Sequence, residues 1–135
     1  MIGLGVVALI LLVGFILYRP KKRSGVIGKE PEGFCASVVG ESHKNYDGES
    51  RQSIIKKLKE GDIVQLAHEK NNKYDDYAVA VISDHGQIGY LKSASSAQRE
   101  VIEWLEDKTE FKAKIHSVGK GEGKYYGVVL DLVEE

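Results

Sequence analysis

The sequence contains a single cysteine, Cys35, among 135 residues. One cysteine excludes an intrachain disulfide framework and suits a reducing compartment. The stability of the fold must therefore come from a packed core. A chain of this length corresponds to one domain with a single small core.

The sequence also lacks an excess of positive charge beyond its first 23 residues. Four of the 19 lysines and arginines lie at positions 19–23, so 15 basic residues remain against 20 acidic ones, a formal charge of about −5. Proteins that grip nucleic acid through a broad electrostatic surface usually carry a basic face. The negative charge argues against such a surface, but it does not exclude a small local binding site for nucleic acid.

No recognisable catalytic or metal-binding motif is present. The four histidines are scattered, and with one cysteine they give none of the spacings of a zinc site, although distant ligands can converge in space. Cys35 lies inside a predicted strand, where we expect a small buried apolar role rather than a nucleophile. We predict no enzyme activity, no metal site and no cofactor. The histidines are His43, His68, His85 and His116.

Charge is absent from residues 2–18, which are apolar or glycine throughout, and four cations follow at positions 19, 21, 22 and 23. As a helix this apolar run spans about 26 Å, just short of the usual ~30 Å hydrocarbon core. Cations after the run, with none before it, differ from the order in a cleaved signal peptide and favour a cytoplasmic carboxyl side. We therefore expect a single-pass transmembrane signal anchor at 1–18, a basic flank and linker at 19–33, and a cytoplasmic domain at 34–135.

The domain reads as strands, with apolar residues alternating along 34–39, 62–69, 77–83, 87–91, 110–118 and 125–133. Two helices are expected, one after Ser50 and one after Ser93 or Ser95, both residues that favour helix N-termini. Both faces of 78–82 are apolar, which indicates a buried strand. Short strands with tight turns predict a mainly β fold, a small OB-like or SH3-like antiparallel barrel of about six strands.

The loop at 71–77 combines two asparagines, two aspartates and two tyrosines immediately before an apolar strand. Loops held at both ends by buried strands are well placed to hold a ligand. Asn and Asp also form turns on their own, because their side chains bond the local backbone. Both interpretations remain open from the residues alone.

Several segments, taken in order, resemble the HIRAN domain family. They are 34–43, 66–69, the Asn72-Lys73-Tyr74-Asp75 loop, the Ala-Val-Ala-Val strand at 78–81 and the Gly-Gln-Ile-Gly-Tyr-Leu segment at 86–91. The match runs from about 34 to 133. The resemblance implies an OB-like barrel, and the best understood HIRAN domains bind the 3′ end of single-stranded DNA.

The resemblance also implies roles for individual residues. Tyr74 would stack on a terminal base, Asp75 would accept a hydrogen bond from the free 3′ hydroxyl, and Asn72 would fix the loop or the nucleotide. Tyr90 occupies the aromatic position of the glycine-rich segment, and Lys92 would meet a phosphate. These roles are physically coherent, because stacking tolerates any base and a carboxylate accepts a hydroxyl proton but repels a phosphate.

The first loop departs from the family pattern. Where DNA-binding members have an Arg-aromatic pair, this chain has Ser42 and His43, with Lys44 next. His43 and Lys44 remain candidate contacts, but the arginine is missing. Two hypotheses follow: a non-catalytic, membrane-anchored module that recognises single-stranded DNA ends at the inner face of a bacterial or phage-infected cell membrane, or a membrane-tethered adaptor that binds a protein or peptide on the same surface.

Overall fold

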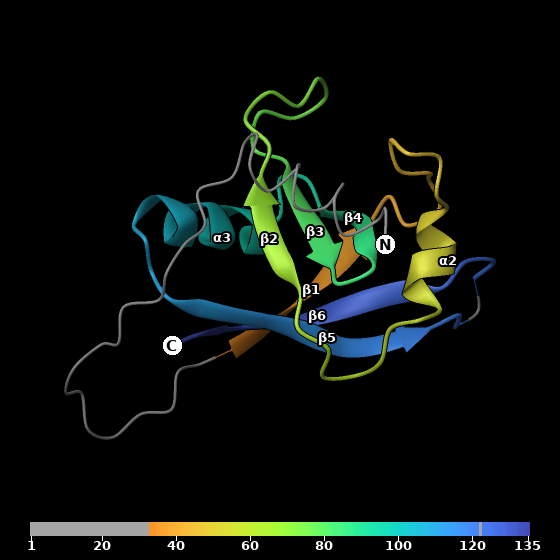
Figure 1. Ribbon diagram of the computed structural model, residues 1–135. Helices are drawn as coiled ribbons and strands as arrows, with labels where there is room; N and C mark the ends of the chain where they lie inside the picture. Colours follow the sequence, from red (N-terminus) through yellow and green to blue (C-terminus); the bar gives the residue numbers. More distant parts are fainter. Residues whose placement is uncertain (1–32, 122) are drawn as a thin grey trace.

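The computed structural model describes residues 33–121 and 123–135 (Figure 1). The predicted anchor at 1–18 and almost all of the linker lie outside these ranges, so both stay predictions. None of the helices in the described ranges combines the length and the hydropathy that a membrane crossing requires.

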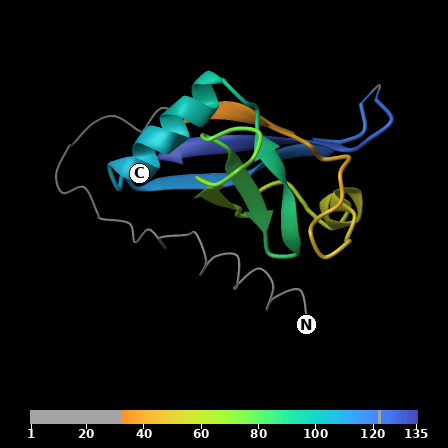
Figure 2. The same cartoon turned by 90° about the horizontal axis from the view of Figure 1, so that it is seen from above.

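Within the described ranges, six strands and two helices follow one another in the predicted order of strand, helix, three strands, helix, two strands. All neighbouring strands are antiparallel, in the spatial order β2-β3-β4-β1-β6-β5. The helices lie at opposite ends of the sheet in both views (Figures 1 and 2). The elements are β1 (Gly33–Val39), α2 (Arg51–Ile55), β2 (Gln65–His68), β3 (Val79–Ser83), β4 (Gly86–Leu91), α3 (Ser96–Glu106), β5 (Phe111–Gly119) and β6 (Gly127–Glu134).

The sheet is not closed into a barrel, so the predicted barrel is wrong in this respect. Its outermost strands are β2 and β5, and no ladder joins them in the described part of the chain. A single bridge pairs Ile63, which precedes β2, with Lys114 of β5. Hydrogen bonds flank this bridge, such as the one that the Ile115 N–H donates to the Asp62 carbonyl at 2.8 Å. The predicted strand at 62–69 divides: its first residues lie along β5, and the rest turn to pair with β3.

The main core fills the space between the sheet and the helices. Strand β3 is buried at every position, as its sequence predicts, and sends Val79 and Val81 into this core. Trp104 of α3 is also buried, with its ring centroid 5.1 Å from that of Phe111. A second, smaller cluster of Ala67, Ala80 and Ile82 is formed by β2 and β3.

The starts of both helices agree with their sequence signals, but only α3 has a side-chain cap. The Ser95 hydroxyl accepts a hydrogen bond from the Gln98 N–H at 3.1 Å, which satisfies a free donor at the helix start. Ser50 occupies the equivalent position of α2 but makes no such bond. A five-residue helix has little stability of its own, so packing must hold α2 in place.

Cys35 is exposed, and the expectation of a buried cysteine is wrong. On β1, Ala36 and Val38 face the core, while the alternate positions Cys35 and Ser37 face outward. The predicted alternation was correct, and the polar Ser37 on the same face was the signal that Cys35 points to solvent.

Candidate functional site

Figure 1 shows the loop between β2 and β3 projecting beyond the ends of these strands. Hydrogen bonds from its own side chains hold it in shape. At its base the Glu69 N–H donates to the Ala78 carbonyl at 2.8 Å. The Asn72 Oδ1 accepts hydrogen bonds from the backbone N–H groups of Tyr74 at 2.9 Å and Asp75 at 3.1 Å. Asn72 therefore fixes the backbone of the loop, the use of asparagine that is typical of turns.

Asp75 ties this loop to the start of α3. Its Oδ2 accepts from Ser93 Oγ and Gln98 Nε2, both at 2.8 Å, and its Oδ1 accepts from the Tyr77 N–H at 2.9 Å. These bonds, led by the Tyr77 N–H, lower the pKa of the Asp75 carboxyl. A carboxylate offers roughly four acceptor positions, so about one remains for a ligand.

The stability contributed by Asp75 is expected to depend on pH. Because its folded-state pKa lies below the ordinary value of 3.8, the contribution is complete above that value and is lost as the pH falls below it. We expect Asp75→Asn to cost about 1–2 kcal/mol of unfolding free energy at neutral pH, from weakened charge-assisted bonds. Urea unfolding of both proteins between about pH 6 and about pH 3 should show this difference shrinking.

Asp76→Asn is the matched control, because its exposed side chain makes no hydrogen bond to any described residue. Its unfolding free energy should stay within about 0.5 kcal/mol of the parent. A difference between Asp75→Asn and the parent that did not change with pH would contradict the assigned role of the carboxylate.

Tyr74 presents its ring to solvent next to this fixed backbone. It is 94 % exposed and makes no ring contact with a described residue. The neighbouring Tyr77 is also exposed, and its ring lies parallel to that of His68 with centroids 6.4 Å apart. An exposed aromatic ring on a fixed backbone can stack on a planar ligand without ordering the loop first.

Tyr90 of β4 joins the loop to the sheet. Its hydroxyl donates to Glu69 Oε1 at 2.8 Å, and the same oxygen accepts from Asn72 Nδ2 at 3.2 Å. Burial of the ring against the small cluster of β2 and β3 raises the pKa of Tyr90. One hydrogen-bonded chain, through Glu69, Asn72 and the loop backbone, therefore runs from Tyr90 to Asp75.

Arg51 lies beside Tyr90, although no motif in the sequence singled it out. Its guanidinium is 5.4 Å from the centroid of the Tyr90 ring, and the residue is only 8 % exposed. Nε donates to Asn45 Oδ1 and Nη1 to the Gly40 carbonyl, both at 2.8 Å. No carboxylate within the described ranges pairs with it, so a largely buried positive charge has only neutral partners.

The remaining predicted residues, which are all exposed, are His43, Lys44 and Lys92. His43 and Arg51 both border Gly40, where an added Cβ would lie 3.8 Å from the His43 ring and 3.1 Å from Arg51 Nη1. Lys44 lies one residue further along the loop, and Lys92 directly follows β4. Neither lysine forms an ion pair with a described residue. Hydrogen bonds thus link Asn72, Asp75 and Tyr90, whereas no such bond ties the Lys44 and Lys92 side chains to them.

Comparison with known proteins agrees with this architecture. A crystal structure of a protein from Lactobacillus plantarum has a TM-score of 0.55 and 19 % identity, over 73 % of this chain and 91 % of that chain. The HIRAN domain of human HLTF has a TM-score of 0.54 and 17 % identity, over 76 % of this chain and 74 % of that chain. At these identities the similarity shows the fold alone.

No curated protein matches the chain. The family model of the HIRAN domain matches residues 36–120, well over half of the sequence. The match covers the first loop, Arg51, the loop around Tyr74 and the glycine-rich strand that carries Tyr90. The chain therefore belongs to the HIRAN domain family.

Proposed function

We propose that this chain is a non-catalytic module that binds the 3′ end of single-stranded DNA. The observation that carries the proposal is the exposed ring of Tyr74 on a loop whose backbone is already fixed. Stacking of a base on an aromatic side chain contributes about 1–3 kcal/mol and accepts any base. In this proposal the sequence-predicted anchor holds the module at the inner face of a membrane, which flotation of the full chain with lipid vesicles tests.

The carboxylate of Asp75 would supply the preference for an end. Its lowered pKa keeps it ionised at neutral pH, and its remaining acceptor position can receive the proton of a 3′ hydroxyl. A phosphate in that place would be repelled by the same charge. An interior nucleotide, whose 3′ oxygen is esterified, is disfavoured in the same way.

Arg51 would supply the positive charge that Ser42 and His43 do not. Its Nη2 makes no hydrogen bond within the described ranges, and its charge has no acidic partner. A largely buried cation with neutral partners is favourable for an incoming phosphate, since the desolvation cost of the cation has already been met in the fold. A single local cation of this kind is compatible with an acidic domain.

Fluorescence anisotropy of the full chain with labelled oligonucleotides tests the proposal. We expect a strand with a free 3′ hydroxyl to bind more tightly than the same strand with a 3′ phosphate. Tyr74→Ala should weaken binding by about 5- to 150-fold, the equivalent of 1–3 kcal/mol of stacking. Tyr125→Ala removes an exposed ring of the β5–β6 hairpin instead of the loop between β2 and β3, and should leave the stacking contribution unchanged.

Two results together would contradict the proposal. Equal affinity for the two strand ends, together with an affinity that Tyr74→Ala does not alter, would overturn the proposal. The adaptor hypothesis, in which the same surface binds a protein or peptide, would then be the one to pursue.

A further inference from the structure

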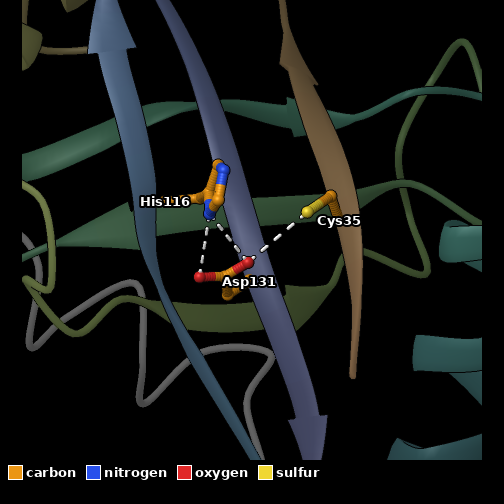
Figure 3. A group of neighbouring side chains, drawn as sticks. All are labelled: Cys35, His116 and Asp131. Atoms are coloured by element: carbon orange, nitrogen blue, oxygen red, sulfur yellow. Dashed lines mark hydrogen bonds and ion pairs between the residues drawn. The ribbon is translucent and has the colours of Figure 1, made fainter. Parts of the chain in front are cut away.

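Three side chains that commonly bind metals meet on the outer face of the sheet, away from the loop of Tyr74. Figure 3 shows Asp131 of β6 between Cys35 of β1 and His116 of β5. Cys35 and Asp131 are directly opposite each other in the β1–β6 register. The two ligands that flank Asp131 are separated from it in sequence by 96 and 15 positions, so no local motif marks the group.

His116 follows the alternation of β5 and lies on the same outer face as Lys114. It also lies at a β-bulge, because Ile115 pairs with Leu130 and Ser117 pairs with Val129, which leaves His116 as the extra residue. Bulges are frequent beside functional sites. The His116 ring extends to Asp131, the residue that a regular ladder would pair only with Lys114.

The ligand atoms are already close to the separations of a tetrahedral site. Cys35 Sγ lies 3.4 Å from Asp131 Oδ1, His116 Nδ1 lies 3.1 Å from the same carboxylate, and all three ligand atoms lie within 4.8 Å of one another. Zinc bonds of about 2.0–2.3 Å in tetrahedral geometry require ligand atoms about 3.3–3.6 Å apart. The two separations from Asp131 thus already match, and Cys35 and His116 would have to approach each other by rotation of their side chains to enclose an ion.

We infer that Cys35, His116 and Asp131 bind a divalent transition-metal ion of the Zn²⁺ type, with water in the fourth position. One sulfur, one imidazole nitrogen and one carboxylate oxygen form a donor set suited to zinc rather than to magnesium or calcium. The site shares no residue with the proposed DNA-binding surface. Metal binding can therefore be tested independently of DNA binding.

The same contacts argue against a cysteine nucleophile. No hydrogen bond joins Cys35 to His116, since Asp131 lies between them (Figure 3). The hydrogen bond to Asp131 raises the pKa of the Cys35 thiol, so the thiolate is disfavoured without a nearby cation. Metal binding supplies that cation: the thiol proton, and any proton on His116 Nδ1, are released to solvent as the metal bonds form.

A bound ion would connect three neighbouring strands through their side chains. Because the unfolded chain does not hold these ligands together, binding stabilises the folded state by mass action. Lys114, directly opposite Asp131, is the nearest cross-strand cation. Its charge lowers the affinity for the metal ion without closing the site.

Cobalt spectroscopy of the full chain gives the sharpest test. Cys35 is the only cysteine in the sequence, so a thiolate-to-cobalt charge-transfer band can come from that residue alone. We expect this band on titration with Co²⁺, its loss on addition of Zn²⁺, and a rise in melting temperature with either ion. Calorimetry with Zn²⁺ should show weakening of at least about 10-fold in Cys35→Ser, His116→Ala and Asp131→Asn.

His85→Ala is the matched control, because His85 is exposed in the β3–β4 hairpin and only its backbone is hydrogen-bonded. Its metal affinity should equal that of the parent. Absence of the charge-transfer band, or Zn²⁺ affinity that falls in His85→Ala as much as in His116→Ala, would overturn the inference. Melting curves without metal separate loss of a ligand from loss of the fold.

Discussion

Replacing Gly89 with alanine is expected to cost about 3 kcal/mol or more of unfolding free energy. A Cβ at this position would lie 2.4 Å from the Val39 carbonyl oxygen and 2.7 Å from Val38 Cγ1. The backbone oxygen cannot rotate away, so β1 and β4 would have to separate. The φ of 152° is also unfavourable for a side chain. Domains of this size have only about 5–15 kcal/mol in total, so much of the stability would be lost.

Gly119→Ala is the control for this experiment. Gly119 lies at the end of β5, has no heavy atom within 4 Å of an added Cβ, and does not have a positive φ. Urea unfolding should place Gly119→Ala within about 0.5 kcal/mol of the parent. Equal stability of the two variants would show that β1 and β4 do not approach each other as described.

The Arg51→Ala variant is expected to lose both stability and DNA affinity. Without the guanidinium, Asn45 Oδ1 and the Gly40 carbonyl lose their donor, at a cost of about 2–4 kcal/mol for two partly buried acceptors. The Tyr90 ring also loses its cation. Chemical unfolding measures the stability term separately from binding.

The DNA affinity of this variant should also become less sensitive to salt. If Arg51 contacts one phosphate, the slope of log affinity against log salt should fall in magnitude by about 1. Measurement at a temperature where both proteins remain folded removes the stability term. Arg99→Ala, on the exposed face of α3, should change neither quantity. A salt slope unchanged in Arg51→Ala would exclude Arg51 from the phosphate contacts.

Local patterns in the sequence predicted much of the fold. Alternating apolar residues located the strands, because the side chains of a strand point to opposite faces at every step. A helix was expected after Ser93 or Ser95 and is capped by Ser95, and both apolar faces of 78–82 indicated the buried β3. These features depend on neighbours in sequence, which is why they could be predicted.

Features that depend on distant residues were missed. Arg51 begins the short helix α2, and its burial results from contacts with Gly40 and Tyr90, which are distant in sequence. The barrel was predicted because short antiparallel strands often close, but the chain before β2 meets β5 through one bridge and a few flanking hydrogen bonds rather than a ladder. The grouping of Cys35 with His116 and Asp131 likewise depends on strand register.

The position of β1 has a consequence for synthesis of the protein. This strand comes first in the described domain, yet it lies between β4 and β6, and Gly33 pairs with Val133. One edge of β1 therefore has no partner until β6 has left the ribosome. Contacts between such distant residues form slowly, since the chain must close a long loop before the pairing is rewarded. The nascent domain thus exposes a strand edge until its last strand, β6, has emerged.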